Sequence, residues 1–383
     1  MVRGCLFGIL LAAVCAAPAS AKVPKGPSGD AFYTYSKKLP SKHGTAIWQR
    51  KLTGQAALKG GSSTLLLYSS TGLDSKPVPV SAVLTVPKGK APKGGWPIVS
   101  WAHGTTGIAD QCAPSRSNIQ QGYDHPLMQR WIKAGYAVVR TDYQGLGTAG
   151  PHPYLNGDAE GHDVLDAVLA ARLANRDINN HVAISGHSQG GQAALFAASL
   201  APKYAPGLKL KGTVAFAPVS HLAEQGAALR SVTTNDLTAL AAMILRGIDI
   251  ADPALNVASL LTPQAATLYP QLDTKCLSDL GKPDSFGSLP TSQLFRSDAN
   301  LDPVIAALGA NDDPEDLKIK TPVQIEQGLA DTTVFPNYTK QTVDALRGRG
   351  GKITYKTYEG INHNGIPQAA VEDTDRFIHK RLG

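Results

Sequence analysis

The chain has 383 residues and a formal net charge of +7; 43% of the residues are hydrophobic and 17% are charged. This length suits one domain with an insertion, or two domains, and it allows a substantial core. Much of the positive charge lies between residues 22 and 93, without the interleaved aromatic residues of a nucleic-acid surface. No zinc, phosphate or dinucleotide motif occurs, so neither nucleic acid nor a cofactor or metal is expected.

Residues 1–21 have the pattern of a secretory signal peptide. A basic residue precedes an apolar run over 5–17, and a small-residue cleavage site ends at Ala21. The run is shorter than the ~20 apolar residues that a membrane-spanning helix needs, and no other stretch approaches that length. We therefore expect cleavage between Ala21 and Lys22, secretion to the periplasm or beyond, and no transmembrane segment.

After the leader, predicted strands alternate with helices. Residues 22–61 are rich in Lys, Gly and Pro, look extended and are expected to wrap the surface. The later alternation indicates a mostly parallel sheet flanked by helices, an α/β fold. The predicted strands are 64–68, 78–86, 97–101, 136–142, 181–185, 210–216, 323–329 and 353–358.

The sequence GHSQG at 186–190 joins the strand predicted at 181–185 to a small-residue run that favours a helix. In a strand-turn-helix setting, G-x-S-x-G is a nucleophile elbow: the glycines let the backbone crowd the turn, and the serine is presented to substrate. The alternative is a glycine-rich packing turn with an inert serine. We interpret Ser188 as a nucleophile.

A serine nucleophile needs a base and an orienting carboxylate. Asp331 comes just after the strand predicted at 323–329, and His363 follows the strand at 353–358. A helical pattern joins these strands into a β-α-β unit, so both side chains are expected at the sheet edge that carries Ser188. The order serine, acid, histidine is that of the α/β-hydrolases.

Other aspartates compete for the role of the acid. Asp302, Asp312 and Asp313 lie in a polar stretch before the strand, and Asp142 precedes the nucleophile in the chain. Chain order therefore favours Asp331, and we expect Asp142 to tie down its own loop. His103 and His187 are interpreted as packing residues beneath the site rather than as bases.

The remaining requirement is a pair of backbone donors for the oxyanion. One donor is the NH of Gln189, the residue after the nucleophile, and the other belongs to the loop after an earlier strand. A sharp turn follows the strand predicted at 97–101, so we predict the NH of Thr105 as the second donor, with Thr106 as the alternative. One such donor is worth about 2.7 to 4 kcal/mol in the transition state.

Residues 220–317, called the cap below, break the alternation. They contain DLTALAAMILRG, which is apolar on nearly every side, and a proline-studded polar stretch. Placed over a serine site, they would wall an acyl-chain pocket and could move to admit substrate. The alternative is a helical subdomain whose apolar residues pack on themselves. The predicted organisation is a signal peptide (1–21), a core in two parts (22–219 and 318–383) and the cap between them.

Several motifs together carry a family resemblance. WAHGTTG, ADQCAPS, the stretch GHSQGGQAALFAASL, LADTTVFP and INHNGI occur in this order. The chain resembles, from about residue 60 to its end, the secretory lipase family of α/β-hydrolases, which holds yeast lipases of the lipase A type and secreted bacterial lipases and esterases. The resemblance implies a triacylglycerol lipase-like ester hydrolase, with Ser188, Asp331 and His363 as its triad and a helical cap.

Of the four cysteines, Cys5 and Cys15 would leave with the leader. In an oxidising compartment the remaining Cys112 and Cys276 are expected to form a disulfide; two free thiols are the alternative. The bond would tie the loop that follows the strand predicted at 97–101 to the cap.

The expected partner is an ester substrate, lipid or otherwise. Contact with a lipid–water interface is a hypothesis, and the basic region 22–93 either favours anionic lipid or cell-wall surfaces or is a solvated face. Three other functions stay open: a cell-wall or feruloyl-type esterase, a serine peptidase of the same fold, and a non-catalytic surface-binding protein.

Overall fold

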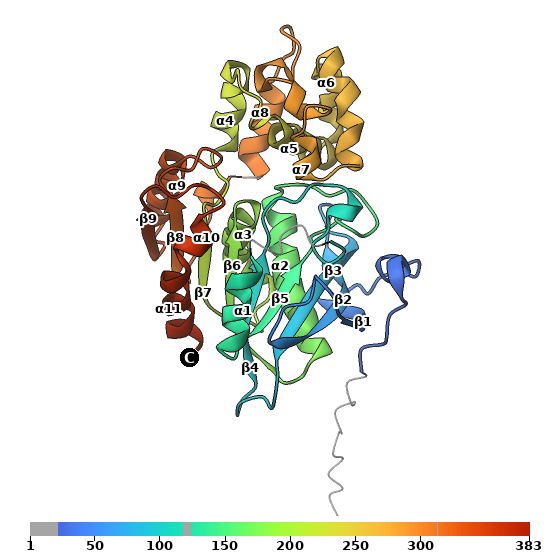
Figure 1. Cartoon of the computed structure of the whole chain (residues 1–383), viewed down its shortest axis with the longest axis vertical. Helices are drawn as coiled ribbons and strands as arrows, with labels where there is room; N and C mark the ends of the chain where they lie inside the picture. The colour runs from blue at the N-terminus through green and yellow to red at the C-terminus, as the bar shows by residue number, and fades with distance from the viewer. Residues whose placement is uncertain (1–21, 118–123, 312) are drawn as a thin grey trace, which may run out of the picture.

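The structure is a computed structural model that describes residues 22–117, 124–311 and 313–383; the predicted signal peptide lies outside the described residues. Across these ranges, nine strands form one sheet (Figure 1). They are β1 (Thr45–Leu52), β2 (Gly61–Thr71), β3 (Pro77–Pro87), β4 (Trp96–Ala102), β5 (Ala137–Thr141), β6 (Ile178–His187), β7 (Lys209–Phe216), β8 (Val323–Gly328) and β9 (Ile353–Tyr358).

The strand order is β1-β2-β3-β5-β4-β6-β7-β8-β9. The pairs β1–β2, β2–β3 and β3–β5 are antiparallel, and the other five pairs are parallel. The chain runs from β4 outward to β5 and then back across β4 to β6, so the strand order reverses beside β4. In open α/β sheets, ligands bind at the carboxyl ends of the strands at such a reversal.

All eight predicted strands are present, and the prediction missed β1 within residues 22–61. β1 is an edge strand, paired with β2 alone, and its register shifts between Ala46 and Trp48. The shift interrupts the alternation that marks a half-buried strand. Its second half is QRKL, a polar stretch typical of an exposed edge, which hid the strand from the sequence pattern.

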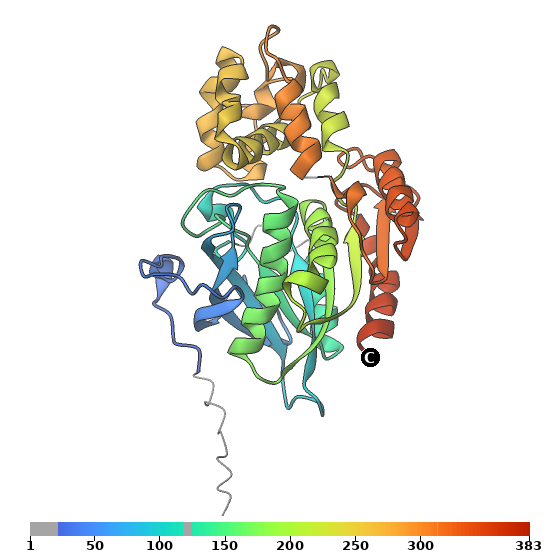
Figure 2. The same cartoon turned by 180° about the vertical axis from the view of Figure 1, so that it is seen from behind.

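Helices cover both faces of the sheet, as Figures 1 and 2 show. α2 (Gly157–Ala174), α3 (Gln189–Tyr204) and α9 (Pro336–Gly348) pack on one face through apolar residues such as Val168, Ala197 and Leu346. α1 (His125–Lys133) and α11 (Val371–Leu382) pack on the other, where Trp131 and Ile378 are buried. α2 is buried on most sides, so several of its acidic residues are buried as well.

Between β7 and β8 the chain leaves the sheet and forms the helices of the cap, which gather above one end of the sheet (Figures 1 and 2). Their residues share a separate apolar cluster that includes Met243, Leu245 and Phe286. The cap boundaries at 220 and 317 stay a prediction. The main helices are α4 (Leu222–Ala228), α5 (Thr238–Ala251), α6 (Pro263–Leu268), α7 (Leu277–Leu280) and α8 (Asp302–Asn311).

Hydrogen bonds join the two ends of the cap to each other, and a disulfide joins the cap to the core. Where the chain enters and leaves it, the backbone NH of Leu222 donates to Asp313 Oδ1 at 2.7 Å, and the NH of His221 donates to Glu315 Oε1 at 3.2 Å. On the opposite side, the predicted disulfide between Cys112 and Cys276 is present, closing a separation of 164 residues. No helix in the described ranges is long and apolar enough to cross a bilayer.

Candidate active site

Ser188 lies at the bend between β6 and α3, with φ 58° and ψ −119°. Two glycines make this bend feasible. A Cβ on Gly186 would lie 2.1 Å from the carbonyl oxygen of Gly190, and a Cβ on Gly190 would lie 2.0 Å from that of Ala102. A side chain at either glycine would collide with backbone, so the pattern G-x-S-x-G has a steric cause here.

Asp331 follows β8 and is held on both carboxylate oxygens. Its Oδ1 accepts the backbone NH groups of Thr333 at 2.8 Å and Val334 at 2.9 Å. Its Oδ2 accepts Gln327 Nε2 at 3.1 Å and His363 Nδ1 at 2.8 Å. The aspartate is only 3% exposed. A fixed, buried carboxylate that accepts from Nδ1 fixes the imidazole tautomer and leaves Nε2 as an acceptor.

His363 lies beside the elbow. Its backbone carbonyl oxygen accepts His187 Nε2 at 3.0 Å, and the two imidazole rings are 4.5 Å apart. His187 directly precedes Ser188, and burial lowers its pKa well below the ordinary value, so its ring is neutral at pH 7. The structure therefore brings Ser188, Asp331 and His363 to one edge of the sheet, with His187 packed beneath them.

The loop after β4 passes directly under the elbow. A Cβ on Gly104 would lie 3.1 Å from the His187 carbonyl oxygen and 3.6 Å from Ser188 Cβ. In the described parts of the chain, the backbone NH groups of Thr105 and Gln189 donate to no other backbone group. Both predicted donors are thus available beside Ser188. Thr105 also lines the same cavity as Ser188, whereas Thr106 is buried, which favours Thr105 over the alternative.

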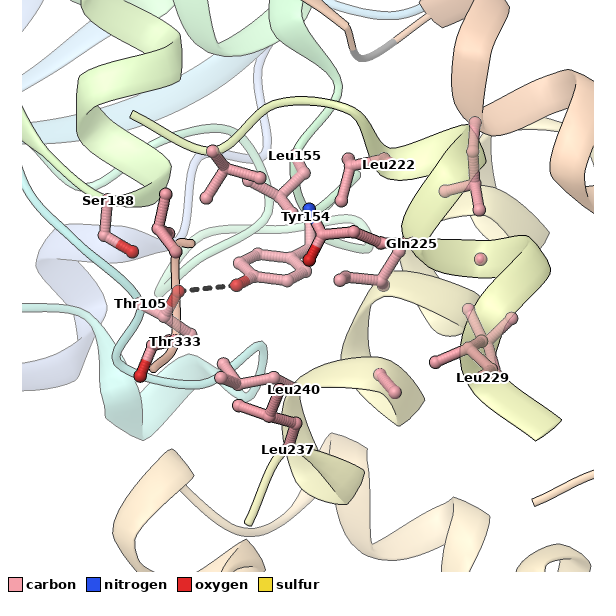
Figure 3. A pocket seen from close by; sticks show the side chains of 17 residues that line it. Thr105, Tyr154, Leu155, Ser188, Leu222, Gln225, Leu229, Leu237, Leu240 and Thr333 are labelled. Carbon is pink, nitrogen blue, oxygen red and sulfur yellow. Dashed lines mark hydrogen bonds between the residues drawn. The ribbon is translucent and has the colours of Figure 1, made fainter. Parts of the chain in front are cut away.

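An apolar cavity opens from Ser188 between the core and the cap (Figure 3). Thr105, Ser188 and Thr333 lie at one side of it, and leucines of the cap face them. The cap residues thus pack on one another and also form a wall of the cavity. The two interpretations of this segment given above are therefore compatible. The apolar lining is made by Leu155, Val219, Leu222, Leu229, Leu237, Leu240, Ala241, Ile244, Leu245, Leu308 and Val334.

The competing aspartates have other partners. Asp142 accepts Ser81 Oγ at 2.6 Å and both the NH and the Oγ of Ser115, so it ties two segments together; burial raises its pKa to about 6. Asp302 begins α8, Asp313 accepts the NH of Leu222, and Asp312 lies outside the described residues.

His103 is buried beneath the loop, as the sequence suggested. Its Nδ1 donates to the carbonyl oxygen of Gly104 at 2.7 Å, and burial lowers its pKa to about 4. The low pKa makes this ring a weak base, and its bond to Gly104 ties it to its own loop, so it is a poor candidate for the catalytic base.

Sequence reasoning missed two polar residues that hold the site. Gln327 donates to Asp331, and Glu160 on α2 accepts the side-chain NH of Gln189 at 2.7 Å. No sequence pattern pointed to either residue, because their roles depend on side chains that meet across different elements.

The family model for secretory lipases matches residues 111–381. The chain belongs to the secretory lipase family. The resemblance read from its motifs is therefore confirmed.

The chain is similar to two proteins that carry lipase names. Lipase A of Moesziomyces aphidis is 30% identical over 227 residues, which cover 54% of this chain and 47% of that protein. A probable inactive lipase of Mycobacterium tuberculosis is 26% identical over 252 residues, covering 61% of this chain and 54% of that protein. The chain spans about half the length of these relatives.

Solved structures share the fold of this chain. Candida antarctica lipase A in its closed state has a TM-score of 0.77 at 20% identity, covering 89% of this chain and 82% of that chain. A ligand-bound form of the rice cell wall degrading esterase LipA from Xanthomonas oryzae has a TM-score of 0.73 at 21% identity, covering 89% and 100%. The predicted α/β-hydrolase fold with a mostly parallel sheet is confirmed.

Proposed function

We propose that this secretory lipase is an exported serine hydrolase of carboxylic esters with an apolar acyl group. The observation that carries the proposal is the His363–Asp331 pair at 2.8 Å beside the elbow that presents Ser188. A buried carboxylate, an oriented imidazole and a serine hydroxyl at a tight turn that lines the cavity are the parts needed to make a serine nucleophilic.

In the proposed reaction, His363 Nε2 takes the proton of Ser188 Oγ as that oxygen attacks the ester carbonyl carbon. Asp331 stabilises the imidazolium, and the NH groups of Thr105 and Gln189 receive the oxyanion. The imidazolium then protonates the leaving alkoxide, which departs as the alcohol and leaves an acyl group on Ser188. Water, deprotonated by His363, repeats the sequence and releases the carboxylic acid.

The apolar cavity supports acyl esters as the substrate class. Its walls are mainly leucine, isoleucine, valine and alanine side chains of the cap, which exclude water and favour a hydrocarbon chain over a charged one. Within the described residues, the cavity wall carries no acidic side chain to bind a peptide amino terminus. This argues against a peptidase.

Replacing the nucleophile tests the proposal. Ser188→Ala is expected to lose about 10⁶-fold in kcat on a p-nitrophenyl ester, the scale seen when a triad serine is removed, with no loss of thermal stability. Ser199→Ala, on the same helix but outside the cavity, is the matched control and should keep wild-type kcat. A folded Ser188→Ala enzyme with wild-type turnover, or wild-type protein without esterase activity, would contradict the proposal.

A cell-wall esterase is the second candidate, because the rice cell wall degrading esterase is covered over its whole length at TM-score 0.73. A non-catalytic protein is a third outcome, since one relative is a probable inactive lipase. A panel of p-nitrophenyl esters from acetate to palmitate, beside triglyceride and feruloyl esters, separates these functions. Hydrolysis of feruloyl esters with no activity on the aliphatic p-nitrophenyl esters or the triglyceride would select the cell-wall role.

Filling the cavity should change which acyl chain is accepted. Ala241 lies on α5, is 6% exposed and lines the cavity. Ala241→Phe is expected to lower kcat/KM for a palmitate ester by about tenfold or more, because the added ring occupies the space of several methylene groups. Acetate hydrolysis by the same variant is the internal control and should be unchanged. Equal losses on both esters would remove the cavity as the acyl site.

The family and the leader pattern also support export. We infer that residues 1–21 are removed and that the enzyme acts outside the cytoplasm, where the disulfide is stable. Amino-terminal sequencing of the exported protein should begin at Lys22.

A further inference from the structure

A buried carboxyl group lies behind the nucleophile elbow, outside the predicted triad. Glu160 belongs to the first turn of α2 and is 1% exposed. Its Oε1 accepts two hydrogen bonds, from Gln189 Nε2 at 2.7 Å and from the backbone NH of Leu155 at 2.9 Å. Gln189 is the residue whose backbone NH is one of the two proposed oxyanion donors.

The hydrogen bond from the Leu155 NH connects Glu160 to the segment that contacts Thr105, the other proposed donor. Leu155 follows Tyr154, whose hydroxyl group is 2.5 Å from Thr105 Oγ1 (Figure 3). Leu155 has a left-handed backbone (φ 64°), an uncommon conformation for leucine that surrounding contacts must hold. Glu160 binds its NH, and Gln192 Nε2 donates to its carbonyl oxygen at 3.1 Å. The segment that contacts Thr105 is therefore clamped from both sides.

We propose that Glu160 is a positioning residue that sets the spacing of the two oxyanion donors, through Gln189 on one side and through Leu155, Tyr154 and Thr105 on the other. The inference rests on the proposed function, since it concerns the same site. Oxyanion stabilisation depends on donor placement within a few tenths of an ångström, so one rigid acceptor shared by both supporting segments has a direct effect on the barrier.

The protonation states fit this role. Burial raises the pKa of Glu160 to about 8, so the group is mostly a neutral acid at pH 7. His152 donates from Nδ1 to the Gln144 carbonyl oxygen at 2.8 Å, which makes its Nε2 an acceptor, and burial lowers its pKa to about 4. Gln189 Nε2 lies 3.3 Å from that Nε2. Both N–H groups of the Gln189 amide are thereby bound, one by each neutral neighbour.

The chemistry of the acceptor provides the rescue test. A glutamine at 160 keeps an Oε1 of the same shape and adds no charge, whereas leucine has similar bulk and accepts nothing. Glu160→Leu is expected to lower kcat on p-nitrophenyl butyrate by about 10²-fold with KM nearly unchanged, the scale of one lost oxyanion donor. Glu160→Gln is expected to stay within about threefold of wild-type kcat, since its acceptor is retained.

Further variants separate positioning from folding. In a double-mutant cycle, Gln189→Ala added to Glu160→Leu should cost less than the sum of the single losses, because both substitutions disturb the Gln189 donor. Tyr154→Phe cuts the other arm at its hydroxyl and should also lower kcat without raising KM. Tyr154→Phe leaves Glu160 in place, so it keeps the inference testable if Glu160→Leu does not fold.

Glu326 offers a matched control. It is a buried carboxyl on β8 that accepts Gln324 Nε2 and Thr374 Oγ1 and has no bond to the oxyanion segments. Glu326→Leu should lower the melting temperature and leave kcat unchanged. The inference is overturned if Glu160→Leu and Glu326→Leu behave alike, or if Glu160→Leu and Tyr154→Phe keep wild-type kcat. Wild-type protein with no esterase activity would instead overturn the proposed function and this inference with it.

Discussion

Gly190 shows how much the site depends on a missing side chain. Its Cβ would lie 2.0 Å from the carbonyl oxygen of Ala102 in β4, a backbone atom at the centre of the sheet. Gly190→Ala is therefore expected to destabilise the fold by about 3 kcal/mol or more, because neither β6 nor β4 can give way. Urea denaturation followed by circular dichroism measures the loss.

A second glycine checks the cause. Gly207 has open space where a Cβ would lie, so Gly207→Ala should shift the urea midpoint very little. Equal destabilisation by the two substitutions would show that the elbow tolerates a methyl group and that contact with Ala102 is not the reason for the glycine.

Single residues differ in how well a sequence reveals them. Ser188, Asp331 and His363 were predictable because each follows a recognisable strand, and strand ends meet at one edge of a parallel sheet. Glu160 and Gln327 were not, since their roles depend on which side chains meet across α2, α3 and β8. Hydrogen-bond geometry of this kind has no periodic signature.

At the scale of elements, the disulfide joins the loop after β4 to the start of α7. Around it, Leu277 NH donates to the Thr106 carbonyl oxygen at 2.9 Å, so the cap directly contacts the loop that carries Thr105. The double variant Cys112→Ser/Cys276→Ser should lose about 2 to 5 kcal/mol of unfolding free energy, because the unfolded chain regains the freedom of a long closed loop.

The measurement is the urea midpoint of unfolding of the double variant and of wild type, each with and without reductant. Reductant should lower the wild-type midpoint and leave the variant unchanged. Midpoints that agree for oxidised wild type and variant would contradict the expected loss of stability.

Elements of the core were easier to predict than those of the cap. A buried parallel strand such as β4, with the sequence WPIVSWA, is a mainly apolar run between glycines and polar turns. The cap consists of short α-helices and 3-10 turns, and α5 is apolar on nearly every side, so periodicity does not locate its boundaries. Its general position could be predicted, but its internal packing could not.

At the scale of the whole molecule, buried carboxyl groups make stability depend on pH, and Glu326 isolates this effect away from the site. Burial raises its pKa to about 8; nearby Asp373 adds to this, while hydrogen bonds from Thr374 and Gln324 and the charge of Lys356 oppose it. An unfolded glutamate has a pKa of about 4.3. Between the two values the unfolded chain has lost a proton that the folded protein keeps.

The contribution of Glu326 to the unfolding free energy is therefore complete below about pH 4 and is lost as pH rises through about 8. Glu326→Gln has no proton to lose at this position, so its melting temperature should fall less than that of wild type between pH 5 and pH 8. Glu160 and Asp163, whose pKa values are also raised to about 8, are present in both proteins. Their contributions to the pH dependence of the melting temperature therefore cancel in the comparison. Parallel curves for the two proteins would contradict the prediction.

The two chain connections of the cap meet through His221, Leu222, Asp313 and Glu315, and the strands on either side, β7 and β8, pair directly with each other. The sheet is thus continuous whatever is inserted there. The cap could therefore be exchanged between relatives while the sheet stays unchanged, provided that Cys276 is retained to form its disulfide with the core. We expect such an exchange to change the cavity wall, and with it the ester preference, while β6, α3 and Ser188 stay in place.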